Sequence, residues 1–318
     1  MLMPPSVTVI VAVYNKIQSL PKTFASLWAQ TFQDFEVICV DDGSEDGSAQ
    51  WCKQQEALHP QIRLVRQSHK GVSAARQAGL EAAKGNYVVH VDPDDWVEPS
   101  FLHRMLEKAQ NEGADMVMCG VWTEYPDCCT PTQTYEDRLY VAPDLLHALV
   151  AQRTHGSVCN KLVRTALARQ TGFHPQTLVC FEDALFLMRL LHVEPTLKIC
   201  GLAACLYHYV VRPSSLTNFI SPHLYQAKRQ LLHEIEQFLP AEQYDGFYAI
   251  KRSVLHWAFV TKQKTDLQCL FPEVQRQVRK EGKWNDKLAV VLTLLHWGVP
   301  FAWVHGLYSL LYRKLRRH

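Results

Sequence analysis

The sequence predicts an α/β protein with a mostly parallel sheet flanked by helices, followed by an all-helical C-terminal region. Two observations carry this prediction. Up to residue 120, short apolar runs alternate with stretches of helical spacing, which is the pattern of βαβ crossovers in a parallel sheet. From about residue 219 onward, the spacing is typical of helices only.

The elements of the first part are expected in strict alternation. Residues 7–13 are apolar and rich in valine, which predicts a buried strand, and residues 20–30 place Phe24, Leu27 and Trp28 on one face of a helix. Further strands are expected over residues 35–40, 62–65, 87–91 and 116–121, and further helices over residues 45–57, 73–83 and 99–110.

The later part begins less regularly. Residues 122–160 contain three prolines and show no clear period. A helix is then expected over residues 182–192 and a strand over residues 197–209. Ser221 and Pro222 have the residue types of a helix N-cap and first turn. Helices are expected over residues 221–238, 244–262 and 271–280 and in the final segment.

Length, charge and cysteine content limit the class of protein. A chain of 318 residues is expected to form about two domains of roughly 150 residues each. A formal net charge of +2 argues against nucleic acid as the main partner. The ten cysteines form no CxxC pair, which predicts free thiols and a reducing cytosol. Residues 1–15 lack a basic region and a cleavage site, so they predict a strand and not a signal peptide.

Polar clusters follow three of the predicted strands. They are Tyr14-Asn15, Asp41-Asp42-Gly43-Ser44 and Asp92-Pro93-Asp94-Asp95. Because ligands of parallel α/β sheets bind beyond the carboxyl ends of the strands, these clusters are expected at one edge of the sheet. Three carboxylates within four positions repel one another unless positive charge lies between them.

Five stretches carry a resemblance to a known family: VTVIVAVYN, FEVICVDDGSEDGS, KGVSAARQAGLEAAKGNYVVHVDPDDW, FEDALF and LYHYVVRPSSLTN. They resemble family 2 glycosyltransferases of the GT-A fold, of the type that builds bacterial surface polysaccharides. The resemblance covers about residues 5–218. It implies a catalytic domain over residues 1–216, with a nucleotide-binding half over 1–120 and an acceptor half over 121–216. Residues 217–318 would form a helical C-terminal region.

The resemblance implies a sugar nucleotide and a divalent metal at the acidic cluster. A cation such as Mn²⁺ or Mg²⁺ neutralises the diphosphate leaving group, and such hard ions prefer carboxylate oxygens. Asp94 is similar to the family's metal ligand, and Asp92 to the residue that approaches both the ribose and the metal. Asp95 is either a supporting group or a helix-starting acid. The implied nucleotide-binding residues are Ala12, Val13, Tyr14, Asn15, Asp41, Asp42, Gly71, Arg76, Asp92 and Pro93.

Several of these nucleotide-binding residues have a specific implied role. Asp42 resembles the residue that accepts a hydrogen bond from uracil N3, which suits an ionised carboxylate. Asp41 either shares that role or caps the following helix, and Asn15 is either a turn residue or a ligand contact. Arg76, on the helix that Gly71 opens, is similar to the arginine that faces the nucleotide or the acids.

The resemblance assigns catalysis to the FEDALF stretch. Asp183 is similar to the base that takes the proton from the acceptor hydroxyl, and Glu182 to a residue that binds the acceptor or the sugar. The alternative is a pair of acids favoured by a helix N-terminus. His208, Arg212 and Ser215 are candidates for the diphosphate. His208 is also a candidate metal ligand or a half-buried strand histidine. Asn160-Lys161 resembles a WNKL-type stretch with Cys159 at the tryptophan position, so its role stays open.

The function implied is that of a metal-dependent inverting glycosyltransferase, a hexosyl- or N-acetylhexosaminyltransferase. It would move a single sugar from a UDP-sugar to a hydroxyl of a saccharide or lipid-linked acceptor in lipopolysaccharide, capsule or exopolysaccharide synthesis. Addition of single sugars is expected because the QxxRW signature of processive synthases and multiple long apolar spans are absent from the sequence. Two alternatives are a polyprenyl-phosphate glycosyltransferase and a non-catalytic sugar-nucleotide-binding or scaffold protein.

The C-terminal segment predicts contact with a membrane. Residues 288–312 contain no Asp, Glu, Lys or Arg, and the chain then ends in RKLRRH. Three interpretations are a transmembrane helix, an interfacial pair of amphipathic helices and a helical pair that packs on the core. The interfacial interpretation is favoured, since tryptophans, tyrosines and terminal basic residues suit the surface of an anionic membrane. It implies a cytoplasmic, peripheral protein at the inner face of the cytoplasmic membrane.

Overall fold

The computed structural model describes residues 4–175, 177–178, 180–212, 221–240, 246–281, 286–296, 299, 301–305 and 308. The chain folds into two compact units. One contains residues 1–149 and 153–215, and the other contains residues 150–152 and 216–318.

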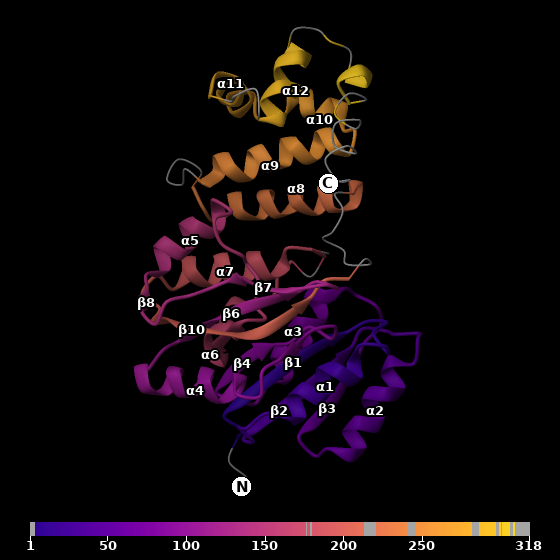
Figure 1. The fold of residues 1–318 in the computed structure, drawn as a ribbon, viewed down its shortest axis with the longest axis vertical. Coiled ribbons are helices and arrows are strands. Elements are labelled where there is room, and N and C mark those ends of the chain that lie inside the picture. The colour runs from indigo at the N-terminus through magenta and orange to yellow at the C-terminus, as the bar shows by residue number, and fades with distance from the viewer. Residues whose placement is uncertain are drawn as a thin grey trace. The chain divides into compact units, whose positions relative to one another are not determined.

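A mixed β-sheet forms the centre of the first unit (Figure 1). Among the described residues it has ten strands, and eight of them follow the order β3-β2-β1-β4-β9-β6-β10-β5. Strand β7 pairs with β6, and β8 pairs with β10. The strands are β1 (Val7–Val13), β2 (Phe35–Asp41), β3 (Ile62–Arg66), β4 (Tyr87–His90), β5 (Trp96–Val97), β6 (Met116–Glu124), β7 (Cys129–Gln133), β8 (Leu139–Tyr140), β9 (Lys161–Arg164) and β10 (Ile199–Val210).

The first half of this sheet is parallel, as the alternating pattern predicts. Strand β1 pairs in parallel with β2 and β4, and β2 pairs in parallel with β3. The register of β1 and β2 runs from Val7 opposite Phe35 to Val13 opposite Asp41. The loops that follow Val13, Asp41 and His90 therefore start at the same edge of the sheet.

The second half departs from the parallel arrangement. Strand β9 lies between β4 and β6 and is antiparallel to both, whereas β10 is parallel to β6. Strands β5 and β8 are antiparallel to β10, and β7 is antiparallel to β6. The predicted α/β fold is confirmed, but the whole sheet is mixed because short strands of two to five residues add antiparallel pairs.

Helices cover the sheet through apolar faces. Helix α1 buries Leu20, Phe24 and Leu27, as its spacing predicts. Helix α3 packs against β1 and β2 and approaches closely at Gly79, where an added Cβ would lie 2.5 Å from Ile10 Cγ2. The helices before residue 194 are α1 (Leu20–Trp28), α2 (Ser48–Leu58), α3 (Val72–Ala82), α4 (Phe101–Glu112), α5 (Ala142–Val150), α6 (Thr165–Thr171) and α7 (Glu182–Val193).

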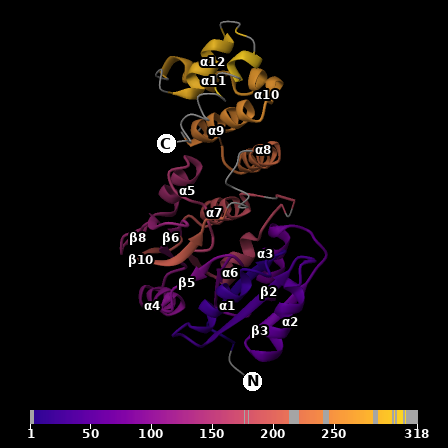
Figure 2. The same ribbon diagram turned by 45° about the vertical axis from the view of Figure 1, so that its right-hand side comes forward.

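The described part of the second unit is helical, as predicted (Figure 2). Ser221 is the N-cap of α8 and accepts a hydrogen bond from the Leu224 backbone N–H at 3.2 Å. Leu231, Val254 and Phe259 are among its buried side chains. The helices are α8 (Pro222–Glu236), α9 (Gly246–Val260), α10 (Lys264–Cys269), α11 (Pro272–Glu281) and α12 (Lys287–His296).

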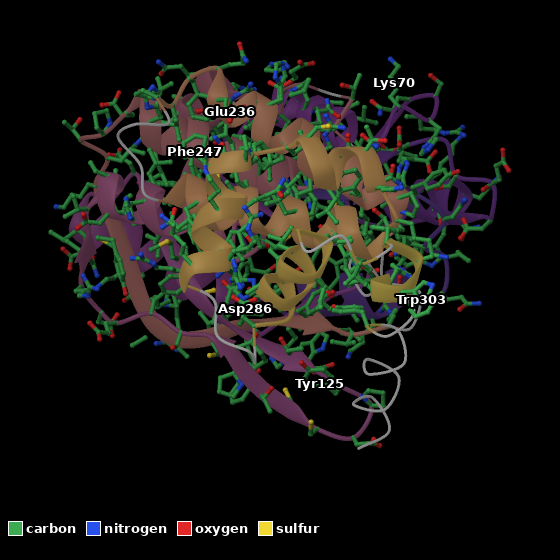
Figure 3. All side chains as sticks on the ribbon, turned by 90° about the horizontal axis from the view of Figure 1, so that it is seen from above. Lys70, Tyr125, Glu236, Phe247, Asp286 and Trp303 are labelled. Atoms are coloured by element: carbon green, nitrogen blue, oxygen red, sulfur yellow. The ribbon has the colours of Figure 1, made fainter. Side chains whose placement is uncertain are left out.

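The apolar C-terminal segment is described only in part. Within it, residues 301–305 are helical, and Trp303 is 76% exposed (Figure 3). Residues 297–298, 300, 306–307 and 309–318 of the expected membrane-contacting segment lie outside the described residues. Of the helices that the structure describes, none is both long and apolar enough to cross a bilayer.

All ten cysteines are free, as predicted. Cys39, Cys119 and Cys200 are buried in the sheet, where a thiol packs as a small apolar group.

Candidate active site

The polar clusters after β1 and β2 are joined at the carboxyl edge of the sheet. Asn15 has a φ of 51°, and its backbone N–H donates to Ser44 Oγ at 3.0 Å. Its Oδ1 accepts from the Glu45 backbone N–H at 2.9 Å. Asn15 is therefore a turn residue that connects two loops. Ala12 and Val13 lie in β1, and the Val13 carbonyl accepts from the Asp42 backbone N–H at 2.8 Å.

Asp42 organises the loop between β3 and α3. It is 2% exposed, and its carboxylate accepts from the backbone N–H groups of Lys70 and Gly71 at 2.8 and 2.9 Å. Gln67 Nε2 donates to the same carboxylate at 2.6 Å, and His69 Nδ1 lies 2.9 Å from it. These contacts were not predicted from the sequence, although the polar run QSHKG marks the loop that supplies all four partners.

An aromatic pair lies beside Asp42. The Tyr14 ring is 41% exposed and stacks on His69, with ring centroids 4.0 Å apart. Asp41 is fully buried, and its Oδ1 accepts from the Ser44 backbone N–H at 3.3 Å. The structure thus brings four of the predicted nucleotide-binding residues together at one loop: Tyr14, Asp41, Asp42 and Gly71.

Asp94 is paired with two cationic side chains. Lys16 Nζ lies 2.6 Å from Asp94 Oδ2, and Arg212 Nη1 lies 2.9 Å from the same oxygen. Arg212 Nη2 also donates to the Asp94 backbone carbonyl at 2.6 Å. Arg212 was predicted near the diphosphate. The structure brings it to residues 92–95, which we call the acidic loop. Lys16 was missed, because a single lysine in a turn has the signature of any exposed residue.

Arg76 connects the acidic loop with the start of α7. Its side chain is 5% exposed, and Nη2 donates to Asp92 Oδ1 at 2.9 Å while Nη1 contacts Glu182. Burial alone would lower the pKa of Arg76, but the carboxylates of Glu182 and Asp92 hold its pKa well above the ordinary value. The guanidinium is therefore a permanent positive charge between the two predicted acid clusters.

Glu182 and Asp183 begin α7 directly after Phe181, whose φ is 70°. Burial raises the pKa of Glu182 to about 7, although Arg76 opposes this shift. Burial also raises the pKa of Asp183, again against the effect of Arg76, while Asp183 accepts a hydrogen bond from the Ala184 backbone N–H at 2.9 Å. The Asp183 residue is half-buried, and a raised pKa makes its carboxylate a stronger base.

Asp95 has a structural role. It is 2% exposed, and it accepts from the Tyr207 hydroxyl at 2.7 Å and from the Val210 backbone N–H at 2.9 Å. Burial is the main reason that its pKa rises to about 8. Asp95 therefore attaches the acidic loop to β10. Of the two roles that the sequence allowed, it has that of a supporting group and not of a helix-starting acid. The neighbouring Pro93 carbonyl accepts from Ser19 Oγ at 2.8 Å.

His208 contacts acids other than Asp94. Its Nε2 lies 2.9 Å from Glu98 Oε1, and its Nδ1 lies 3.1 Å from Glu124 Oε1. The donor atoms of His208, Glu124 and Cys129 lie within 4.8 Å of one another. The ring also stacks on Trp96 at 3.5 Å. Ser215, the third diphosphate candidate, lies outside the described residues.

Asn160 and Lys161 are buried and support the fold. Asn160 Nδ2 donates to the Cys119 carbonyl at 2.6 Å. Lys161 Nζ donates to the Ser157 carbonyl at 2.6 Å and to Asn160 Oδ1 at 2.9 Å. Both side chains thus stabilise the start of β9.

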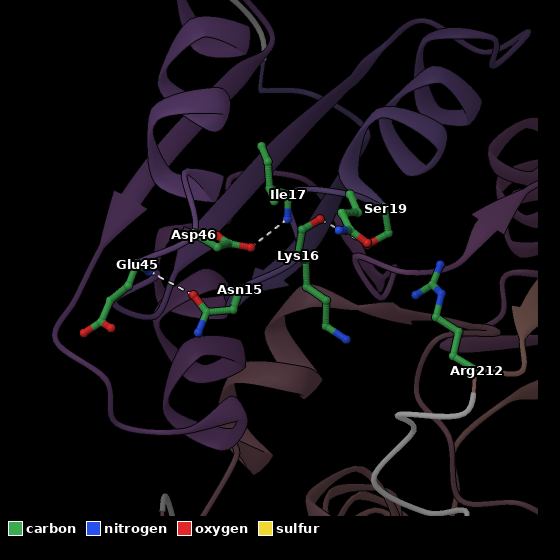
Figure 4. A pocket seen from close by; sticks show the side chains of 8 residues that line it. Asn15, Lys16, Ile17, Ser19, Glu45, Asp46 and Arg212 are labelled. Atoms are coloured by element: carbon green, nitrogen blue, oxygen red, sulfur yellow. Dashed lines mark hydrogen bonds between the residues drawn. The ribbon is translucent and has the colours of Figure 1, made fainter.

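A pocket of about 600 Å³ opens beside the acidic loop (Figure 4). Lys16 lines it from the turn after β1, and Arg212 lines it from the segment after β10. The other lining residues are Asn15, Ile17, Gln18, Ser19, Glu45 and Asp46.

The donor set of the acidic loop suits a divalent cation. Asp92 and Asp94 are 35% and 26% exposed, so their carboxylates can be reached from solvent. Carboxylate oxygens are the ligands that Mg²⁺ and Mn²⁺ prefer. The ammonium of Lys16 and the guanidinium of Arg212, both at Asp94 Oδ2, show that this oxygen attracts positive charge.

Comparison with known proteins identifies the family and the fold. Residues 8–170 match the model of the family described as "Glycosyl transferase family 2". The Bacillus subtilis (strain 168) protein named "Uncharacterized glycosyltransferase EpsJ" is 31% identical over 240 residues, which are 71% of this chain and 69% of EpsJ.

Two solved structures share the fold. The structure of S. aureus TarS 1-349 in complex with UDP-GlcNAc has a TM-score of 0.64 at 20% identity, over 97% of this chain and 92% of the TarS chain. The mannosyltransferase PcManGT from Pyrobaculum calidifontis, in complex with GDP-Man and Mn²⁺, has a TM-score of 0.54 at 17% identity, over 98% of this chain and 89% of that chain.

Proposed function

The chain belongs to glycosyl transferase family 2 and is a glycosyltransferase, and on this premise we propose that it moves one sugar from a UDP-sugar to a hydroxyl group with inversion. The observation that carries the proposal is the contact of Arg76 with both Asp92 and Glu182. Asp92 belongs to the proposed site for the donor and the metal, and Glu182 belongs to the proposed site for the acceptor or the sugar. A displacement at the sugar carbon needs both sides in one site, because one acid takes a proton while the diphosphate leaves.

The donor base binds beside Tyr14 and Asp42 in this proposal. An ionised carboxylate has about four acceptor positions, and Gln67, His69, Lys70 and Gly71 use that number on Asp42. A uracil N3–H can therefore reach Asp42 only when the side chain of Gln67 or His69 gives way. The complex of TarS with UDP-GlcNAc supports the choice of a UDP-sugar.

Asp94 and Asp92 are proposed to hold a divalent cation, Mn²⁺ or Mg²⁺. Such an ion supplies positive charge that stabilises the leaving diphosphate. Arg212 adds a further positive charge at the same loop, since it contacts Asp94 at 2.9 Å. The Mn²⁺ complex of PcManGT, which shares the fold, supports a metal-dependent reaction.

Asp183 is proposed as the base that deprotonates the acceptor hydroxyl. Its raised pKa suits this role, since a stronger base takes a proton more readily. Glu182 is proposed to contact the acceptor or the sugar, and its contact with Arg76 fixes its position.

The remaining proposals rest on the family resemblance. We assign catalysis to residues 1–216 and propose a saccharide or lipid-linked acceptor from bacterial lipopolysaccharide, capsule or exopolysaccharide synthesis. We also propose that residues 288–318 contact the inner face of the cytoplasmic membrane. The uncharged residues 288–312 and the basic terminus support that contact.

A substitution of Asp183 tests the proposed mechanism. Asp183→Asn keeps the shape of the side chain but removes the base, so UDP release from a panel of UDP-sugars, with water as the acceptor, should fall by roughly 10²–10⁴-fold. The Kd for UDP in the presence of Mn²⁺ should stay within about twofold of wild type. Asp144→Asn, at an exposed acid of α5, is the control and should leave the rate unchanged. An unchanged rate in Asp183→Asn would refute the role of Asp183 as the base.

A further inference from the structure

Two cationic side chains contact a single carboxylate oxygen, Asp94 Oδ2. Lys16 Nζ and Arg212 Nη1 lie 2.6 and 2.9 Å from this single oxygen. One cation is enough to neutralise the Asp94 carboxylate, so Lys16 and Arg212 share this oxygen. Asp92 and Asp95 attract the Lys16 ammonium without contacting it, and Asp92 itself pairs with Arg76.

The two cations are held differently. Arg212 has a second anchor, the hydrogen bond from Nη2 to the Asp94 carbonyl at 2.6 Å. For Lys16 Nζ, Asp94 is the single acceptor within the part of the chain that the structure describes. The Lys16 side chain is 38% exposed, and an ammonium has three donors. Lys16 can therefore leave Asp94 with little disturbance, whereas Arg212 is tied to the loop.

The Lys16 side chain has a place to move. It lines the pocket of about 600 Å³ together with Arg212, and Figure 4 shows both side chains pointing into the same space. Asp46, an acid of the lining, is already engaged with the backbone N–H groups of Ile17 and Ser48 at 3.0 and 2.9 Å. Lys16 and Arg212 are the two basic side chains of the lining, so an anion that binds there can contact both.

We propose that Lys16 is a donor-binding residue, which pairs with Asp94 until a metal ion takes that oxygen and then neutralises the diphosphate of the donor. This inference rests on the proposed function. A divalent cation and an ammonium repel each other at one carboxylate oxygen, so metal binding displaces Lys16. The displaced ammonium then favours an anion in the pocket.

This exchange makes the two ligands interdependent. The Lys16–Asp94 pair opposes a metal that binds alone, whereas the released Lys16 favours a diphosphate that binds with the metal. By linkage, the metal and the nucleotide each raise the affinity of the other. Removal of the Lys16 charge is therefore expected to change the two affinities in opposite directions.

Lys16→Met in the full-length protein tests the exchange. Binding of Mn²⁺ without nucleotide, followed by electron paramagnetic resonance of the free ion, should become about 3- to 10-fold tighter. Binding of UDP at saturating Mn²⁺, followed by calorimetry, should become about 10-fold weaker, since a charge-assisted hydrogen bond is lost. Lys16→Arg keeps the charge and should retain UDP affinity within about threefold. The backbone bond from Lys16 N–H to Ser48 Oγ, at 2.9 Å, stays in both variants.

Lys22→Met is the matched control. Lys22 lies in α1, is 58% exposed and pairs with Glu124 at 3.3 Å, so its substitution removes the same charge from the same unit without touching Asp94. Both affinities should stay within about twofold of wild type. If Lys16→Met leaves both affinities unchanged, or weakens both, the role of Lys16 is refuted while the metal site stands. If the wild-type protein does not bind Mn²⁺, the metal part of the proposed function falls together with this inference.

Discussion

The surroundings of Asp183 predict how activity depends on pH. Burial raises its pKa from 3.8, Asp92 adds to the rise, and Arg76 and Lys161 oppose it. A base acts only when deprotonated, so the rate falls as the pH drops through this raised value. The acid limb of kcat/KM should therefore lie at a higher pH than an ordinary aspartate gives.

The measurement is a pH profile of UDP release. Thermal unfolding recorded at each pH separates loss of the base from loss of the fold. An acid limb at or below the pKa of an ordinary aspartate would contradict the role of Asp183 as the base.

Single residues differ in how well their roles could be predicted. The acids Asp42, Asp94 and Asp183 stand out because their residue types and spacing carry chemistry. The partners of these acids do not stand out in the sequence. Lys16 lies 78 positions from Asp94, and Gln67 lies 25 positions from Asp42. Such contacts depend on how loops fold back at the sheet edge, and no local pattern encodes them.

Secondary structure was predictable where an element is long enough to show its period. Strands β1 and β2 have seven residues each, and their apolar runs gave bounds within one residue. Strands β5 and β8 have two residues each, and β9 has four, so they show no usable alternation. The antiparallel β9 therefore changed the sheet from mostly parallel to mixed without a signal in the sequence.

The packing of α3 on the sheet leads to a stability prediction. At Gly79, an added Cβ would lie 2.5 Å from Ile10 Cγ2 and 3.3 Å from Val40 Cγ2. Gly79→Ala should therefore lower the free energy of unfolding by about 1–3 kcal/mol through overpacking. This loss is expected even though alanine favours a helix by up to about 1 kcal/mol.

Urea denaturation with fluorescence detection measures that change. Glu81→Ala, at an exposed position of the same helix, is the control and should stay within about 0.5 kcal/mol of wild type. A Gly79→Ala protein as stable as wild type would show that α3 can move away from β1 at no cost.

At the scale of the whole molecule, the two compact units differ in the functional residues that they contain. The first contains the acids, the basic residues and the pocket that the proposed reaction uses. The second is helical where described and supplies none of the predicted catalytic acids. Its basic end, Arg313, Lys314, Arg316 and Arg317, follows 25 uncharged residues, which suits attraction to anionic lipid more than catalysis.

Neutralising this basic end tests membrane contact in the full-length protein. Each basic residue near an anionic surface contributes about 1 kcal/mol, so replacing all four by Gln should weaken co-sedimentation with phosphatidylglycerol vesicles by at least about 100-fold. Wild-type binding should also weaken as salt is raised, because the attraction is screened. The matched control replaces four exposed basic residues of the first unit by Gln: Lys53, Lys84, Arg153 and Lys198. If both quadruple variants bind vesicles equally, the terminus does not anchor the protein, and residues 288–318 are better explained as a helical pair that packs on the protein core.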